Sequence, residues 1–229
     1  MRERLAASRI LLVDRLPPAR AILTGILTRL GIPATSIHHA EHGQSALAQL
    51  AEQPADIVIS ALDFAPVSGL ELLARIRQGE SAAPANQPVL VVTADGTPEH
   101  RLAAARLAVD GVIAKPPHPL QVERSIIRLL ATRRPAEPAC CQVVRLPAAL
   151  PADRTIVRPV LALTPGQMLT SDLLGHNGTL LLPRGSLLTA AVISVLLQYR
   201  RHFGIENATL LRATQPHEAA PVATPVATS

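Results

Sequence analysis

Short apolar runs alternate with helical patterns over the first 131 residues of the chain. Four of these runs are continuous and rich in branched side chains, which is typical of parallel strands covered by helices on both faces. They are Ile10-Leu11-Leu12-Val13, Ile57-Val58-Ile59, Val89-Leu90-Val91-Val92 and Val112-Ile113. A weaker run at Ser36-Ile37-His38 would add a fifth strand. The pattern predicts an α/β fold with a five-stranded, doubly wound parallel sheet.

Apolar residues at helical spacing mark helices between and after these strands. One apolar face begins at Ile22 and stops at Gly31, a second covers 70–76 and stops at Gly79, and a third covers 122–130. Glycine ends helices readily because it adopts the left-handed conformation without steric cost. In sheets of this kind, sites lie at the carboxyl ends of the strands.

The character of the sequence changes after the first 131 residues, which we take as the first domain. Residues 132–153 are rich in proline and lack periodicity, which predicts a semi-rigid linker. Residues 154–213 combine two short strands around Gly178, a helix capped by Thr189 and a closing strand, so we expect a small α+β domain. A domain of this size has a marginal core and is expected to pack against another surface. The Ala/Pro/Thr-rich tail at 214–229 is expected to be disordered.

Composition argues against several classes of function. The only aromatic rings belong to Phe64, Tyr199 and Phe203, too few for a protein that stacks the bases of single-stranded nucleic acid. The net charge of +5 comes from scattered arginines rather than a dense basic stripe, so DNA binding is not indicated. Neither a membrane span nor a signal peptide is evident, and we expect a cytoplasmic protein. Among the basic residues one is a lysine, Lys115, and all others are arginine.

Cysteines and histidines offer weak metal signals. Cys140 and Cys141 are neighbours in the proline-rich stretch, where they can hardly bridge each other, so we expect reduced thiols. His38, His39 and His42 cluster near the second strand without a cysteine or carboxylate pair at matching spacing. Exposed loop histidines are therefore favoured over a metal site.

Five motifs then occur in order along the predicted sheet. They are Ile10-Leu11-Leu12-Val13-Asp14, Ala40-Glu41-His42-Gly43-Gln44-Ser45-Ala46-Leu47, Ser68-Gly69-Leu70-Glu71-Leu72-Leu73, Thr93-Ala94 and Lys115-Pro116. Together they make the first 131 residues resemble the receiver domain of bacterial response regulators. The resemblance implies a flavodoxin-like fold and a two-component, phosphorelay signalling role. In that family a phosphoryl group is accepted by an aspartate at the end of the third strand, with Mg²⁺ held by neighbouring acids.

The acidic pocket departs from the family pattern. Asp14 supplies one acid, but Arg15 stands where a second acid usually follows, and its charge would oppose metal binding. The position of the phosphoacceptor is Ala61, whose methyl group cannot be phosphorylated. Asp63 lies two residues on and is an alternative acceptor, with a weak Mg²⁺ site at Asp14 and Asp63, although a solvated loop carboxylate is the preferred interpretation of Asp63.

The switch residues are only partly retained. Thr93 matches the hydroxyl that responds to phosphorylation, but Val112 replaces the aromatic partner, three residues before the lysine. Lys115 matches the family lysine, and with no acceptor its expected role is structural, bonded to Asp14.

The second unit resembles a small module with a Leu-x-Pro-Gly-Met-x-Leu core that accompanies receiver and HD-GYP signalling domains. The match includes 163–169, where Gln167 is inserted, and 180–185. The His-Asp pair and Gly-Tyr-Pro motif of an HD-GYP phosphodiesterase are absent from the sequence, as are a glycine-rich phosphate loop and a nucleophile elbow. We therefore expect no enzyme and no cofactor.

Three hypotheses follow from these observations. The first is an atypical, phosphorylation-independent response regulator that acts as an adaptor for a signalling protein, such as a sensor kinase or an output enzyme, and that can form a homodimer. The second is a phosphorylatable receiver that uses Asp63 and Mg²⁺ and has a DNA-binding output. The third is a cyclic-dinucleotide-binding protein that uses Arg200 and Arg201.

Overall fold

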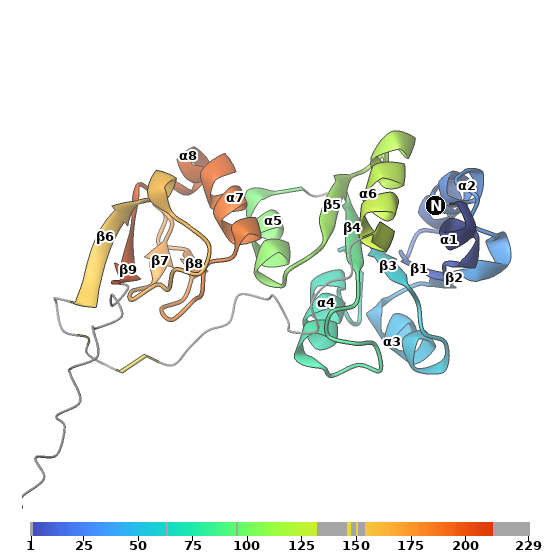
Figure 1. Cartoon of the computed structure of the whole chain (residues 1–229), viewed down its shortest axis with the longest axis horizontal. Helices are drawn as coiled ribbons and strands as arrows, with labels where there is room; N and C mark the ends of the chain where they lie inside the picture. The colour runs from blue at the N-terminus through green and yellow to red at the C-terminus, as the bar shows by residue number, and fades with distance from the viewer. Residues whose placement is uncertain are drawn as a thin grey trace, which may run out of the picture.

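The computed structural model describes residues 2–62, 64–94, 96–131, 146–147, 150 and 154–212. Two units lie side by side along the long axis (Figure 1). The first contains α1 (Arg2–Ala7), β1 (Ile10–Val13), α2 (Pro17–Arg29), η1 (Ala34–Ser36), β2 (Ile37–Ala40), α3 (Gly43–Glu52), β3 (Ile57–Ser60), α4 (Gly69–Gln78), β4 (Val89–Thr93), α5 (Pro98–Arg106), β5 (Gly111–Ala114) and α6 (Pro119–Ala131).

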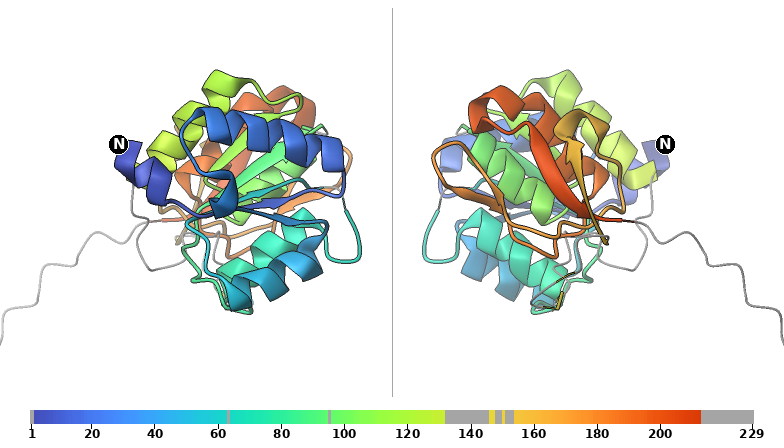
Figure 2. Two further views of the ribbon diagram at one scale, coloured as in Figure 1. Left: turned by 90° about the vertical axis from the view of Figure 1, so that its right-hand side faces the viewer. Right: turned by 90° about the vertical axis from the view of Figure 1, so that its left-hand side faces the viewer.

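The five strands of the first unit form a parallel sheet in the order β2-β1-β3-β4-β5. Helices α2 and α6 lie over one face, and α3 and α4 lie over the other (Figure 2). Successive residues of β1 serve opposite faces, since Ile10 and Leu12 join the cluster under α2 and α6, whereas Leu11 and Val13 join the cluster under α3 and α4. The predicted flavodoxin-like α/β fold is confirmed.

Two details of the first unit differ from the sequence-based prediction. Ile22 was expected on the buried face of its helix but is 53% exposed, because the buried stripe of α2 consists of Leu23, Ile26 and Leu27. Helix α1 was not predicted; it packs onto the same face of the sheet through Leu5.

The second unit is a small α+β assembly. It contains β6 (Thr155–Pro159), η3 (Val160–Ala162), β7 (Leu173–Leu174), β8 (Leu180–Leu182), α7 (Ala190–Gln198), α8 (Arg200–Phe203) and β9 (Asn207–Leu211). Antiparallel pairs are formed by β6 with β9 and by β7 with β8. The single helix expected between Thr189 and Gly204 is divided, because Tyr199 leaves helical geometry with φ −109° and ψ 17°.

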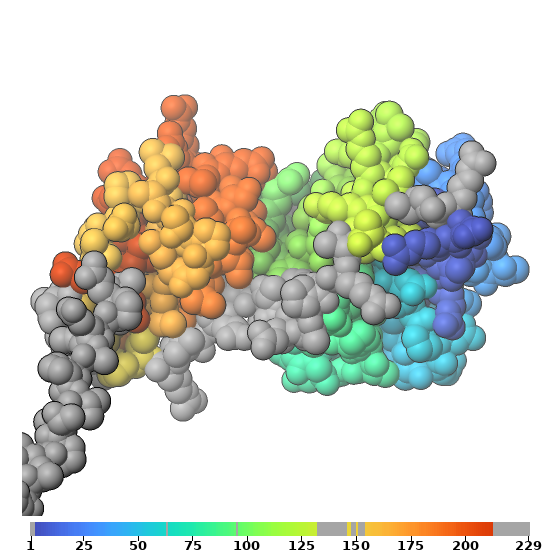
Figure 3. Space-filling model, in the orientation of Figure 1, coloured from blue at the N-terminus to red at the C-terminus, as the bar shows by residue number. Residues whose placement is uncertain are grey.

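The second unit packs against α5 of the first. Leu102 and Ala105 of α5 are 3% exposed and belong to the same apolar cluster as Val192 and Leu196 of α7. Figure 1 shows α5 beside α7, and the space-filling view shows the two units in contact there (Figure 3). Polar contacts flank this cluster: His202 meets the Glu99 carboxylate at 2.8 Å. The described helices include none that is both long and apolar enough to cross a membrane.

Candidate functional site

The parallel sheet brings the predicted site residues to one edge. Asp14 directly follows β1, and its N–H donates to the carbonyl oxygen of Ala40 at the end of β2, at 3.1 Å. Ala61 directly follows β3, and its N–H donates to the carbonyl of Val13 at 2.8 Å. Thr93 is the last residue of β4 and is 2% exposed. Asp14, Ala61 and Thr93 therefore lie at the carboxyl ends of three adjacent strands, where such sheets carry their sites.

Both carboxylate oxygens of Asp14 have a donor. Oδ1 accepts a hydrogen bond from the N–H of Leu16 at 2.9 Å, and Oδ2 accepts one from the Lys115 ammonium. Lys115 reaches the site from the end of β5, where its N–H donates to the carbonyl of Thr93 at 2.8 Å. The side chains of Asp14 and Lys115 are 5% and 21% exposed, so their ion pair is largely shielded from solvent.

A second cation approaches Asp14 from α2. The Arg20 guanidinium donates to the main-chain carbonyl of Asp14 at 2.6 Å, and its Nη2 lies 3.5 Å from the Glu41 carboxylate. Arg15, the residue expected to oppose metal binding, is exposed, whereas Arg20 makes these contacts. The signal in the sequence was a basic residue in the first turn of α2, six residues after Asp14. The contact was not predicted, because it depends on how α2 docks over the sheet.

Around Ala61 the chain is tightly packed. Ala61 is 7% exposed, and its carbonyl accepts a hydrogen bond from the Ser60 hydroxyl at 2.7 Å. The start of α4 lies against the same carbonyl, because a Cβ placed on Gly69 would come within 1.9 Å of it. Asp63, the alternative acceptor, lies outside the described residues.

The histidines near β2 have structural surroundings. His38 and His39 lie within β2 rather than in a loop, which corrects the expectation for these two residues. His42 caps α3, where its Nδ1 accepts a hydrogen bond from the N–H of Ser45 at 3.2 Å. Burial lowers the pKa of His39, with further lowering from the nearby charge of Arg20. In the part of the chain that the structure describes, no three histidine, cysteine or acidic residues are grouped to hold a metal.

The described residues of the pocket do not fit Mg²⁺. This ion requires near-octahedral oxygen ligands, which acidic side chains usually supply together with water. Asp14 is already engaged through both oxygens, Glu41 is 70% exposed and paired with Arg20, and Ala61 offers a methyl group. Two cations at the pocket also oppose a third.

Comparison with known proteins identifies close similarity over the first unit. The family described as "Response regulator receiver domain" matches residues 10–126. Chemotaxis protein CheY-3 of Vibrio cholerae is 33% identical over 108 residues, which are 47% of this chain and 80% of that protein. Chemotaxis protein CheY of Pseudomonas aeruginosa is 31% identical over 108 residues, covering 47% of this chain and 84% of that protein.

A solved structure supports the same fold. A putative response regulator from Chloroflexus aurantiacus J-10-fl matches with a TM-score of 0.50 and 24% identity. The match covers 55% of this chain and 98% of that structure.

Proposed function

Since the chain belongs to the response regulator receiver domain family over residues 10–126, we propose that it is an atypical member that works without phosphoryl transfer. The observation that carries this proposal is Ala61. It follows β3 directly, at the position that the family resemblance gives to the phosphoacceptor, and a methyl group cannot form an acyl phosphate.

The cations around Asp14 support the same conclusion. In a phosphorylated receiver, the lysine holds a phosphoryl oxygen, whereas here the Lys115 ammonium is bonded to the Asp14 carboxylate. Breaking a largely buried pair leaves an uncompensated charge, which is costly. We infer that this pair, with Arg20 beside it, fixes the pocket in one arrangement and gives Lys115 a structural role.

A receiver of this kind would act by binding a partner protein through its surface rather than by carrying out a chemical step. We propose that the chain is a protein-interaction adaptor and not an enzyme, with receiver 1–131, linker 132–153 and partner-binding module 154–213 ahead of the tail 214–229. Its partner would be a sensor kinase or an output enzyme, and a homodimer is part of the proposal. The similarity of 163–185 to modules that accompany HD-GYP signalling domains supports a role in signalling.

The pocket can be tested by amide NMR of the full chain. Adding Mg²⁺ with beryllofluoride, which mimics a phosphoryl group, is expected to leave the amide signals of Asp14, Thr93 and Lys115 unchanged. The Ala61→Asp variant is the matched positive control, because it restores the carboxylate and should gain shifts at these positions. Saturable shifts in the natural chain that disappear in Asp63→Asn would overturn the proposal and favour Asp63 as the acceptor.

A further inference from the structure

A cavity of about 370 Å³ lies between the end of β6 and α8 in the second unit. Its volume is in the lower part of the range for small-molecule sites. The lining combines apolar residues with three ionisable side chains. The first group is Pro159, Val160, Leu161, Gly204 and Ile205, and the second is Arg200, Arg201 and Glu206. The cavity lies outside the receiver pocket and plays no part in the function proposed for that pocket.

The two arginines of this cavity are unneutralised. Arg200 is half-buried and Arg201 is exposed, and within the described residues neither guanidinium has a hydrogen bond or an ion pair. The second unit holds six arginines and only two acids between residues 154 and 212. Because both arginines line the same cavity, an anion bound in it would gain from both charges.

An inorganic anion alone would leave most of the lining unused. Leu161 is 68% exposed and lines the same cavity, so it offers apolar surface to a ligand bound there. A guanidinium stacks on planar rings as well as binding phosphate oxygens. An apolar wall beside two such groups therefore suits a ligand that carries both a phosphate and a flat base.

Glu206 adds a preference among bases. Its carboxylate is exposed at the cavity and can accept hydrogen bonds, for which guanine offers adjacent N–H donors on one edge and adenine does not. The walls are fixed to each other, because the N–H of Val160 donates to the carbonyl of Glu206 at 2.8 Å. The N–H of Ile205 donates in turn to the carbonyl of Arg200 at 3.1 Å.

We propose that this cavity binds a guanine nucleotide through a phosphodiester, and that a cyclic dinucleotide of guanine is the ligand class. Arg200 and Arg201 hold the phosphodiester oxygens, the wall at Leu161 covers the base, and Glu206 accepts from its N–H edge. A ligand bound here lies on the module, so it offers a chemical signal in a chain whose receiver has no phosphoacceptor at Ala61.

Isothermal titration calorimetry of the full chain with cyclic di-GMP tests this directly. Saturable heat is expected, and Arg200→Ala and Arg201→Ala should each weaken the affinity about tenfold or more, as expected for the loss of a charge-assisted contact. Arg4→Ala removes the same charge from α1 of the first unit and should leave the affinity within about twofold. Circular dichroism establishes that each variant is folded.

Titrations with cyclic di-AMP and with inorganic phosphate distinguish binding of the guanine base from binding of any anion. Cyclic di-AMP should bind about tenfold more weakly than cyclic di-GMP, and Glu206→Gln should narrow that difference. Absence of heat with cyclic di-GMP, or unchanged affinity in Arg201→Ala, would overturn the site. Equal affinities for the two dinucleotides would overturn the assignment of guanine, and equally tight binding of inorganic phosphate would reduce the cavity to a general anion site.

Discussion

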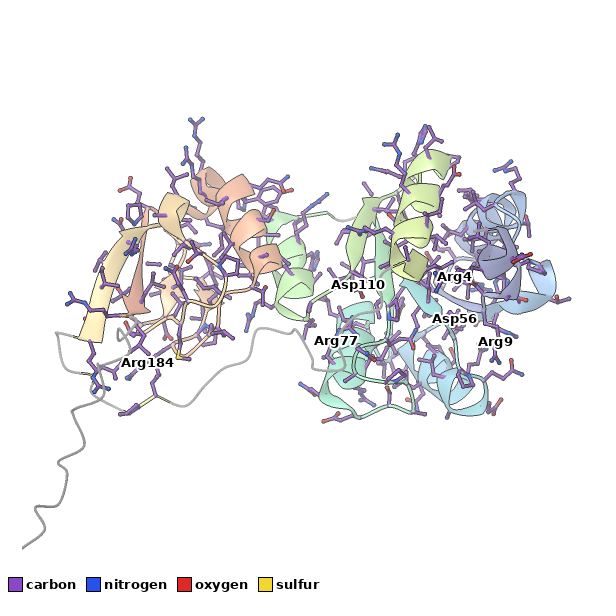
Figure 4. The ribbon with its side chains drawn as sticks, in the orientation of Figure 1. Arg4, Arg9, Asp56, Arg77, Asp110 and Arg184 are labelled. Atoms are coloured by element: carbon purple, nitrogen blue, oxygen red, sulfur yellow. The ribbon has the colours of Figure 1, made fainter. Side chains whose placement is uncertain are left out.

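Arg77 is a charged residue in the interior of the receiver. Its side chain is 1% exposed, and its guanidinium bonds the Asp110 carboxylate at 3.1 Å (Figure 4). It also donates to four main-chain carbonyls, those of Ala85, Gln87, Leu107 and Ala108, at 3.0, 2.8, 3.2 and 3.2 Å. The same Asp110 oxygen accepts from the N–H of Val89 at 2.8 Å. One side chain thus joins α4 to the segments that precede β4 and β5.

Replacing Arg77 with methionine should be strongly destabilising. The substitution removes Arg77 from the Asp110 carboxylate, whose side chain is only 16% exposed, and breaking a buried pair typically costs about 3–5 kcal/mol. Urea unfolding of the full chain measures the loss. The control is Arg75→Ala, two residues before Arg77 on the same helix. It removes an exposed ion pair with Glu71 and should cost about 0.3–0.5 kcal/mol. Similar losses in the two variants would show that the buried network does not stabilise the fold.

The part of the candidate site that could be predicted from the sequence consists of the residues that match family motifs. The resemblance to the receiver family assigned Asp14, Ala61, Thr93 and Lys115 to strand ends, and the structure has each of them at or directly after the end of a strand. Arg20 was not predicted, because its role depends on how α2 docks over the sheet. Glu206 was not predicted either, because its place beside Arg200 and Arg201 depends on the turn at Gly204.

Elements with a clear local pattern could be predicted from the sequence, whereas a strand that depends on pairing with a distant strand could not. Strands β1, β3, β4 and β5 contain continuous apolar runs and could be found locally, whereas β2 gave only a weaker run because His38 and His39 interrupt it. Strand β6 was missed, because Arg158 and Pro159 interrupt its apolar pattern and its extended form rests on pairing with β9. Helix α4 was found together with its end, since Gly79 adopts a left-handed φ of 76°.

The junction between β3 and α4 requires a glycine. A Cβ on Gly69 would lie 1.9 Å from the Ala61 carbonyl, so Gly69→Ala must displace the backbone of one element. We expect the urea midpoint to fall sharply. Gly25→Ala in the interior of α2 is the matched control, because its Cβ would meet nothing within 4 Å. That change should stabilise the fold by about 0.5–1 kcal/mol. Equal effects of the two changes would contradict the close approach.

At the scale of the whole molecule, the module and the receiver are joined through α5. This surface is apolar at its centre, and the receiver residue Leu102 clusters with the core of the module. Partners that need α5 would have to displace the module, so we expect the adaptor surface to lie elsewhere on the chain.

Leu102→Ala should loosen this contact while leaving the sheet intact. A cavity from Leu→Ala costs about 2–5 kcal/mol, and here it opens between the two units. Hydrogen exchange followed by mass spectrometry should show faster exchange in α7 and unchanged protection in β1 and β3. Leu120→Ala, at a residue 55% exposed on α6, is the control and should change neither. Unchanged exchange in α7 would mean that the α5 contact does not stabilise the module.

The contact between Glu99 and His202 makes the junction sensitive to acid. The hydrogen bond from His202 lowers the pKa of Glu99, so the carboxylate stabilises the folded chain above the ordinary glutamate pKa. This contribution is lost as the pH falls through the lowered pKa. The urea midpoints of the natural chain and of Glu99→Gln should therefore differ at about pH 6, and the difference should shrink as the pH falls below the ordinary glutamate pKa of about 4.3. A difference that persists in acid would assign the effect to another group.

We expect the receiver fold to be kept without its phosphoryl chemistry, and intact mass spectrometry after incubation with acetyl phosphate and Mg²⁺ measures whether a phosphoryl group is added. The natural chain should keep its mass, as should Asp63→Asn, whereas Ala61→Asp restores a carboxylate at the family position. A stable gain of about 80 Da in the natural chain, absent from Asp63→Asn, would contradict the account and identify Asp63 as the phosphoacceptor.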